Sequence, residues 1–231
     1  ATTGNITDSG TLAITGTTTL VTSANDATIT LNDTSNAFTG ALTITTNDSS
    51  GTDADVTIDG GTTALIIAAS TIDGDLTLTS GHASGITDSG NVTVGGNLAA
   101  TTDDNDGVIN MGTLLVDGTV ALTTNGTGAA TVVNDAGLNF AASTVGGALS
   151  ATATTGNMTD SGALTIAGTS SFATSASGAD ITLNTTTNAF TGAVTITTND
   201  VSGTDADVTI DGGTTAFILA ASTIDGDLTV R

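Results

Sequence analysis

Aspartate is the residue type with the most chemistry to offer in this chain. All 23 acidic residues are Asp, because Glu is absent, and the only residue among Lys and Arg is Arg231. Carboxylate and loop carbonyl oxygens are the ligands that Ca²⁺ prefers. With so few basic side chains, cations from solution are what can offset this charge. The sequence therefore gives these candidate calcium ligands: Asp53, Asp55, Asp59, Asp103, Asp104, Asp106, Asp205, Asp207 and Asp211.

None of these groups matches a known calcium loop. The run Asp103-Asp-Asn-Asp-Gly107 lacks the remainder of an EF-hand, and the glycine-rich nonapeptide calcium repeat is absent. Solvated aspartates in turns are the alternative interpretation, and diffuse stabilisation by salt or divalent cations is compatible with both. We expect no required cofactor, with Ca²⁺ as the candidate ion.

Asp103 and Asp104 are also a conceivable carboxylate pair for cleaving a glycosidic bond. Other catalytic groups are scarce, because Lys, Glu, Tyr and Cys are absent and His82 lies beside Gly81, where we expect an exposed turn. Near-identical repeats also argue against one unique pocket. We therefore expect no enzyme. A polysaccharide-binding or polysaccharide-cleaving protein is the alternative.

Thr-x-Thr triplets are a further candidate surface, because a flat face with Thr on every turn of a solenoid organises water as ice does. An ice-binding protein is thus another alternative. Thr is, however, simply a favourable strand residue, and the loops vary too much in length for an unbroken flat array. The triplets are Thr28–Thr30, Thr43–Thr45, Thr77–Thr79 and Thr195–Thr197.

The elements that would position these residues are short strands. Apolar residues alternate with Thr, which places them on one face of a strand and Thr on the other. Turn residues separate the alternating segments, as in Asp59-Gly60-Gly61 and Asn125-Gly126. No helical period occurs. The clearest strand triplets are Leu42–Ile44, Val56–Ile58, Leu76–Leu78, Val92–Val94, Leu164–Ile166 and Val208–Ile210.

A duplication sets the order of these strands. Residues 3–78 and 155–230 align without a gap at a spacing of 152, and 18 of the 76 aligned positions differ. Three shorter markers recur about every 72 to 80 residues, so each repeat contains two half-repeats. They are Ile-Thr-Asp-Ser-Gly (Ile6, Ile86 and, with Met, Met158), Ala-Ala-Ser-Thr (Ala68, Ala141 and Ala220) and Thr-Thr-Asn (Thr45, Thr123 and Thr197).

These patterns predict an all-β fold, a parallel β-solenoid of short coils that runs through residues 1–231. Residues 4–155 form one repeat, with half-repeats at about 6–85 and 86–157, and residues 156–231 begin the next. Glycines in turns suggest coils of roughly 15 to 20 residues, hence eight to ten coils and roughly 40–50 Å per repeat at strand spacing. A β-sandwich is the alternative, but Trp, Tyr, Cys and Pro are absent.

Two runs, Ile72–Gly81 and Ser89–Leu98, resemble the coils of filamentous-haemagglutinin-type exoproteins and autotransporter passengers. The resemblance covers essentially the whole chain through composition and coil rhythm. It implies a right-handed parallel β-helix that is bacterial, secreted and located at the cell surface, as a filament, sheath or adhesin shaft. It also implies self-association, end to end or laterally into fibres, and a carbohydrate or another cell-surface ligand as a partner.

Charge narrows the partners further. The formal net charge of −22 would repel nucleic acid and anionic membranes, so we expect neither as a partner. No apolar run is long enough to span a bilayer, so we expect no membrane insertion. The chain begins and ends inside its own repeat, which predicts a segment of a longer polypeptide or a protomer whose ends meet its neighbours.

Overall fold

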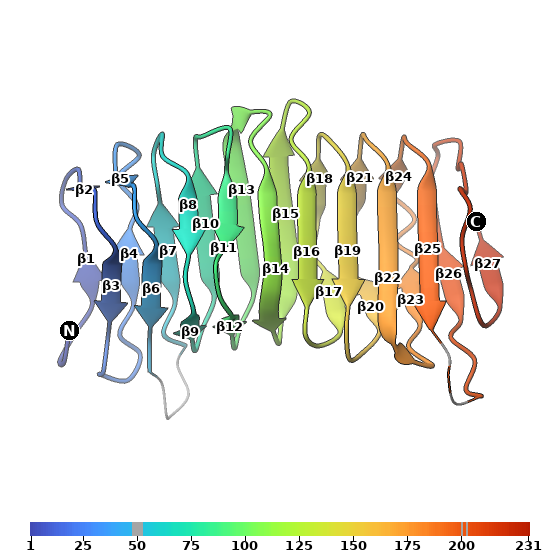
Figure 1. Cartoon of the computed structure of the whole chain (residues 1–231), viewed down its shortest axis with the longest axis horizontal. Helices are drawn as coiled ribbons and strands as arrows, with labels where there is room; N and C mark the ends of the chain where they lie inside the picture. The colour runs from blue at the N-terminus through green and yellow to red at the C-terminus, as the bar shows by residue number, and fades with distance from the viewer. Residues whose placement is uncertain (48–52, 200, 202) are drawn as a thin grey trace.

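Alternating apolar and polar residues form the strands of a parallel β-solenoid in a computed structural model of the chain (Figure 1). In β10 (Leu76–Ser80), for example, Leu76 and Leu78 are completely buried while Thr77 and Thr79 are partly exposed. The structure describes residues 1–47, 53–199, 201 and 203–231, and only the main chain of Asn105. Within these residues every strand pair is parallel, and no helix is long and apolar enough to cross a membrane. The predicted all-β solenoid is confirmed.

Two long sheets enclose the core. Sheet 1 contains β1 (Ile6–Thr7), β4 (Ile29–Leu31), β7 (Val56–Asp59), β10, β13 (Leu98–Asn105), β15 (Thr119–Asn125), β17 (Leu138–Phe140), β18 (Ser143–Val145), β20 (Met158–Asp160), β21 (Leu164–Ile166), β23 (Ile181–Leu183), β24 (Ala189–Phe190), β26 (Val208–Ile210) and β27 (Leu228–Val230). Sheet 2 contains β3 (Thr18–Val21), β6 (Leu42–Thr45), β8 (Leu65–Ile67), β9 (Ser70–Ile72), β11 (Ile86–Asp88), β12 (Val92–Val94), β14 (Ile109–Val116), β16 (Ala130–Asn134), β19 (Leu149–Ala153), β22 (Ser170–Ser177) and β25 (Val194–Asn199). A small third sheet pairs β2 (Ala13–Ile14) with β5 (Ala37–Phe38).

Each coil contributes strands to both sheets. Residues paired along sheet 1 are 20 to 27 positions apart, from Val56 and Leu76 at the short end to Ile29 and Val56 at the long end. The path from β1 to β20 therefore takes seven coils for one 152-residue repeat. Seven coils advance about 34 Å at strand spacing.

The coil length predicted from the glycine spacing was too short. Each coil has more than one glycine bend, because glycines occur both at corners between the sheets and at bends within one sheet, so their spacing measures less than a whole coil. Gly74 and Gly96 lie at corners where the chain enters sheet 1, before β10 and β13, whereas Gly90 lies at a bend between β11 and β12, which both belong to sheet 2. The predicted eight to ten coils and 40–50 Å per repeat are thus replaced by seven coils and about 34 Å.

The sequence markers change sheet from one half-repeat to the next. Ile6 and Met158 lie in sheet 1, while Ile86 lies in sheet 2. The Thr-Thr-Asn marker behaves likewise, because Thr45 and Thr197 are in sheet 2 and Thr123 is in sheet 1. Each half-repeat therefore spans three and a half coils. The two broad faces of the solenoid carry the same sequence module, displaced by half a repeat.

Candidate functional site

The predicted calcium ligands form three groups in sequence, at residues 53–59, 103–106 and 205–211. A strand separates the members of the first group and of the third group. Asp55 precedes β7 and Asp59 ends it, and Asp207 and Asp211 flank β26 in the same way. Four residues of extended chain separate the members of each pair by about 13 Å. A single ion therefore cannot be bound by both ends of either group. Asp53 and Asp205 are exposed; Asp48 and Asp200, which extend the two groups in sequence, lie outside the described residues.

Corner aspartates instead bind the main chain of the next coil. The Oδ1 atom of Asp55 accepts the N–H of Asp75 (2.8 Å), and Asp75 Oδ1 accepts the N–H of Asn97 (2.6 Å). Asn97 Oδ1 continues the series with the N–H of Thr119 (2.8 Å). We call these four residues the corner ladder. Each carboxylate or amide in it compensates a main-chain donor that the corner leaves without a strand partner.

The same arrangement recurs in the second copy of the repeat. Asn157 Oδ1 accepts the N–H of Asp180 (2.9 Å), and Asp180 Oδ1 accepts the N–H of Asp207 (2.9 Å). Asp207 Oδ1 in turn accepts the N–H of Asp227 (2.8 Å). Asp55 and Asp207, both predicted calcium ligands, thus hold neighbouring coils together.

The Asp of the Ile-Thr-Asp-Ser-Gly marker also accepts hydrogen bonds from the main chain of the next coil. Asp88 accepts the N–H groups of Gly112 (3.0 Å) and Thr113 (2.7 Å) and also the Thr113 hydroxyl (2.9 Å). Asp8 and Asp160 accept consecutive N–H groups and a buried Asn amide in their own next coils. Although burial of Asp8 favours its neutral form, hydrogen bonds from Asn36 and from main-chain N–H groups hold the pKa of Asp8 below its usual value.

Asp106 belongs to another corner. Its Oδ1 atom accepts both the N–H (2.6 Å) and the hydroxyl (2.7 Å) of Thr127, and these hydrogen bonds lower the pKa of Asp106. Asp106 also has a positive φ of 66°, which Asp tolerates better than most residues. Asp106 therefore contacts Thr127, whereas Asp103 and Asp104 lie in a different environment.

One recess does collect predicted ligands. It has a volume of about 230 Å³ and is lined by Thr34, Asp59, Gly61, Thr62, Gly81, Asp103 and Asp104. Burial raises the pKa of Asp59, repulsion from Asp103, Asp33 and Asp8 adds to the rise, and the N–H of Gly61 opposes it from 2.7 Å. Among the described residues, however, no three Asp or His side chains are grouped as a metal-binding set. The recess concentrates the negative charge of Asp59, Asp103 and Asp104, and calcium binding there stays a prediction.

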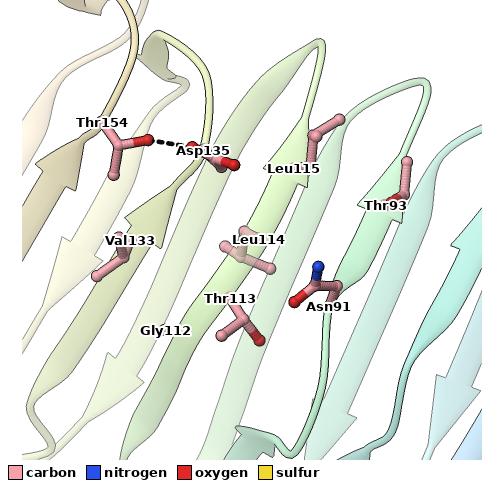
Figure 2. A pocket seen from close by; sticks show the side chains of 9 residues that line it. All are labelled: Asn91, Thr93, Gly112, Thr113, Leu114, Leu115, Val133, Asp135 and Thr154. Carbon is pink, nitrogen blue, oxygen red and sulfur yellow. Dashed lines mark hydrogen bonds between the residues drawn. The ribbon is translucent and has the colours of Figure 1, made fainter. Parts of the chain in front are cut away.

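A second depression lies on the outer side of sheet 2 (Figure 2). Its volume is about 230 Å³, and Leu115 and Val133 form its apolar part. A hydrogen bond from the Thr154 hydroxyl to Asp135 closes one rim, and Asn91 and Thr93 lie at the other. In the sequence, the pair Leu114-Leu115 marks this groove, because Leu115 takes the outward strand position that Thr usually occupies. Its complete lining is Asn91, Thr93, Gly112, Thr113, Leu114, Leu115, Val133, Asp135 and Thr154.

The remaining predictions concern His82 and the Thr triplets. His82 is exposed in a turn, as predicted, and its Nδ1 atom accepts the N–H of Ser84 (2.9 Å). The Thr triplets are divided between the sheets, with Thr77–Thr79 in sheet 1 and Thr43–Thr45 in sheet 2. In sheet 1 the outward column that contains Thr77 continues as Ala99 and Ala121. The Thr residues therefore form short patches on both faces.

Comparison with known proteins gives one match. The family described as "Repeats of unknown function (DUF5649)" matches residues 1–45, 53–106 and 127–197. The chain belongs to this repeat family. No curated protein and no solved structure matches the chain. The fold and the family agree on a repetitive β-solenoid, and the resemblance to filamentous-haemagglutinin-type exoproteins and autotransporter passengers stays a prediction.

Proposed function

We propose that the chain is a structural segment of an extracellular surface fibre, either the subunit of a filament or sheath or the shaft of an adhesin, with no catalytic role. The observation that supports it most strongly is the half-repeat of three and a half coils. Each half-repeat adds length and places the same sequence markers on the alternate face. Modules of this kind suit a rod whose length is its function.

The hydrogen bonds between coils support the same role. Asp and Asn side chains connect each coil to the next at the corners, in addition to the strand ladders. Three of the predicted calcium ligands, Asp55, Asp106 and Asp207, thus connect neighbouring coils. A net charge of −22 keeps such rods soluble and apart from one another at low salt.

The location at the cell surface is tested on the cells that make the chain. Antibodies against the purified chain should label intact cells, and immunogold particles should follow fibres that extend from the surface. Particles along the whole fibre would indicate a filament subunit, and particles confined to a stalk below a tip would indicate an adhesin shaft. Labelling that requires permeabilised cells would contradict the proposal.

The groove of Figure 2 favours polysaccharide binding as a second candidate function. Thr hydroxyls, Asn91 and Asp135 surround an apolar floor, a combination that binds sugars. Sugar sites commonly add an aromatic ring, yet four of the five Phe residues are completely buried and Phe217 contacts Phe190. Titration of the labelled chain with oligosaccharides should therefore give weak, saturable NMR shifts at Leu115 and Val133. Shifts that do not saturate would contradict a site.

A further inference from the structure

The depression of Figure 2 lies where the middle half-repeat departs from its neighbours. The coil that follows Asp8 contains an exposed turn, Thr34-Ser35, and the coil that follows Asp160 contains the matching turn, Thr186-Thr187. The coil that follows Asp88 is two residues shorter and is strand at this place, in β14. The depression therefore occupies the place that a turn occupies in the other two half-repeats.

Two substitutions accompany the shorter coil. Leu115 takes an outward position that is Ala in the other two half-repeats, and Asp117 takes a corner position that is Thr in both. An apolar side chain and a negative charge are thus added close together. The replaced residues are Ala37, Ala189, Thr39 and Thr191, aligned through the corner glycines Gly40, Gly118 and Gly192.

A second depression continues the first around this corner. It has a volume of about 480 Å³ and lies where the chain enters sheet 1. Three coils pass from the lining of the first depression to that of the second within two residues, at Leu115–Val116, Asp135–Ala136 and Thr154–Gly156. Asp117 belongs to the lining of the second depression. We call the two depressions together the corner cleft.

The strands beneath the corner cleft do not offer the edge to which an extended peptide commonly binds. Such a peptide adds to a free sheet edge through main-chain hydrogen bonds. Strand β14 pairs with β12 on one side and with β16 on the other, and β16 also pairs with β19. Side chains are left to recognise a ligand, namely the apolar Leu115 and Val133 and their polar rim. A sugar ring, with carbon–hydrogen faces and hydroxyl edges, matches this combination.

Charge selects among sugars. Asp117 is exposed, and no described residue donates a hydrogen bond to its carboxylate. Asp135 is exposed too, and its Oδ1 atom accepts the Thr154 hydroxyl. The lining of the corner cleft contains no Lys, Arg or His. An acidic sugar is therefore repelled, whereas a protonated amino group is attracted.

We propose that the corner cleft binds an oligosaccharide that carries free amino groups, with its rings on Leu115 and Val133 and its ammonium groups beside Asp135 and Asp117. This proposal rests on polysaccharide binding as the second candidate function and specifies the class of ligand. The ligand lies across the corner and contacts both sheets. A single sugar reaches only one of the two depressions, so affinity should increase with chain length until both are filled.

Titration of the isotope-labelled chain with a glucosamine tetramer tests this ligand class, and cellotetraose is the uncharged comparison. At about pH 5.5 exposed carboxylates are ionised and amino groups are protonated. We expect saturable NMR shifts at Leu115 and Gly118, on both sides of the corner, and about 2- to 30-fold tighter binding of the glucosamine tetramer through two exposed ion pairs. Equal affinities would overturn this proposal and leave polysaccharide binding intact. Absence of saturable shifts with both sugars would overturn both.

Asp117→Asn should weaken binding of the glucosamine tetramer about 2- to 5-fold and leave cellotetraose binding unchanged. The matched control is Asp73→Asn, because Asp73 is exposed and precedes Gly74 at the same corner two coils earlier. An equal loss from both substitutions would indicate attraction by overall charge and overturn the site. A lysine tetrapeptide that binds as tightly and shifts the same residues would overturn a sugar as the ligand.

Discussion

At the residue scale, the aspartates of this chain act as hydrogen-bond acceptors for main-chain donors. A corner of a solenoid leaves N–H groups that no strand partner reaches, and a short carboxylate reaches them from the previous coil. Asp88 shows the arrangement most fully, because its two oxygens accept two consecutive N–H groups and a hydroxyl. The absence of longer acidic residues is consistent with this role, since the acceptor must stay close to its own corner.

Replacing Asp88 should therefore loosen one corner of the solenoid. Asp88→Ala leaves the N–H groups of Gly112 and Thr113 without their acceptor, at a local cost of about 1–3 kcal/mol. Their amide hydrogen exchange should accelerate about 5- to 150-fold if opening is local. Asp117→Ala is the control, since Asp117 is exposed and its carboxylate accepts no hydrogen bond from the described residues. Equal acceleration by both substitutions would contradict the role of Asp88.

The contribution of Asp59 to folding stability should have the opposite pH dependence from the contribution of Asp8. Because the pKa of Asp59 is raised, its contribution to stability is complete below the usual Asp pKa and is lost as the pH rises through its folded-state pKa. Asp59→Asn should thus raise the urea midpoint at pH 7 and leave it nearly unchanged at pH 3. Asp211→Asn is the control, because Asp211 makes the same contact with Gly213 outside the acidic recess. A gain for Asp59→Asn only at pH 3 would contradict the sign.

At the element scale, the sequence predicts the strands of each coil well and the length of the coil poorly. The alternation in Leu42–Ile44 and Val92–Val94 predicts strands correctly, since burial on one face requires it. The coil length was predicted wrongly because a glycine marks a bend without indicating whether the chain passes to the other sheet there, as it does at Gly74 but not at Gly90. The pairing of Asp88 with Gly112, or of Asp55 with Asp75, depends on that length. Sequence alone therefore could not place these acceptors opposite their donors.

Glycine at coil corners permits the close approach of neighbouring coils. A Cβ atom on Gly192 would lie 2.4 Å from the carbonyl oxygen of Gly168 in the previous coil. Gly192→Ala should consequently destabilise the chain by about 1–3 kcal/mol. Gly112→Ala is the matched control, because a Cβ atom there meets nothing within 4 Å. Urea denaturation followed by circular dichroism compares them, and equal midpoints would contradict close packing at Gly192.

At the scale of the whole molecule, charge and shape act together. A net charge of −22 with a single Arg makes the rod repel itself along its entire length. Added salt should therefore raise the thermal midpoint gradually, because screening weakens this repulsion. NaCl and CaCl₂ matched in ionic strength should give similar midpoints. A saturable heat of Ca²⁺ binding, with a larger midpoint in CaCl₂, would instead show a specific site.

Each 152-residue repeat should add a fixed length to a rod of constant width. A second copy of residues 4–155, inserted in frame, makes this length measurable by small-angle X-ray scattering of the original and extended chains under the same conditions. We expect the maximum dimension to grow by about 34 Å, seven coils at strand spacing, while the cross-sectional radius of gyration stays the same. An unchanged length with a wider cross-section, or two separate bodies joined by a linker, would contradict it.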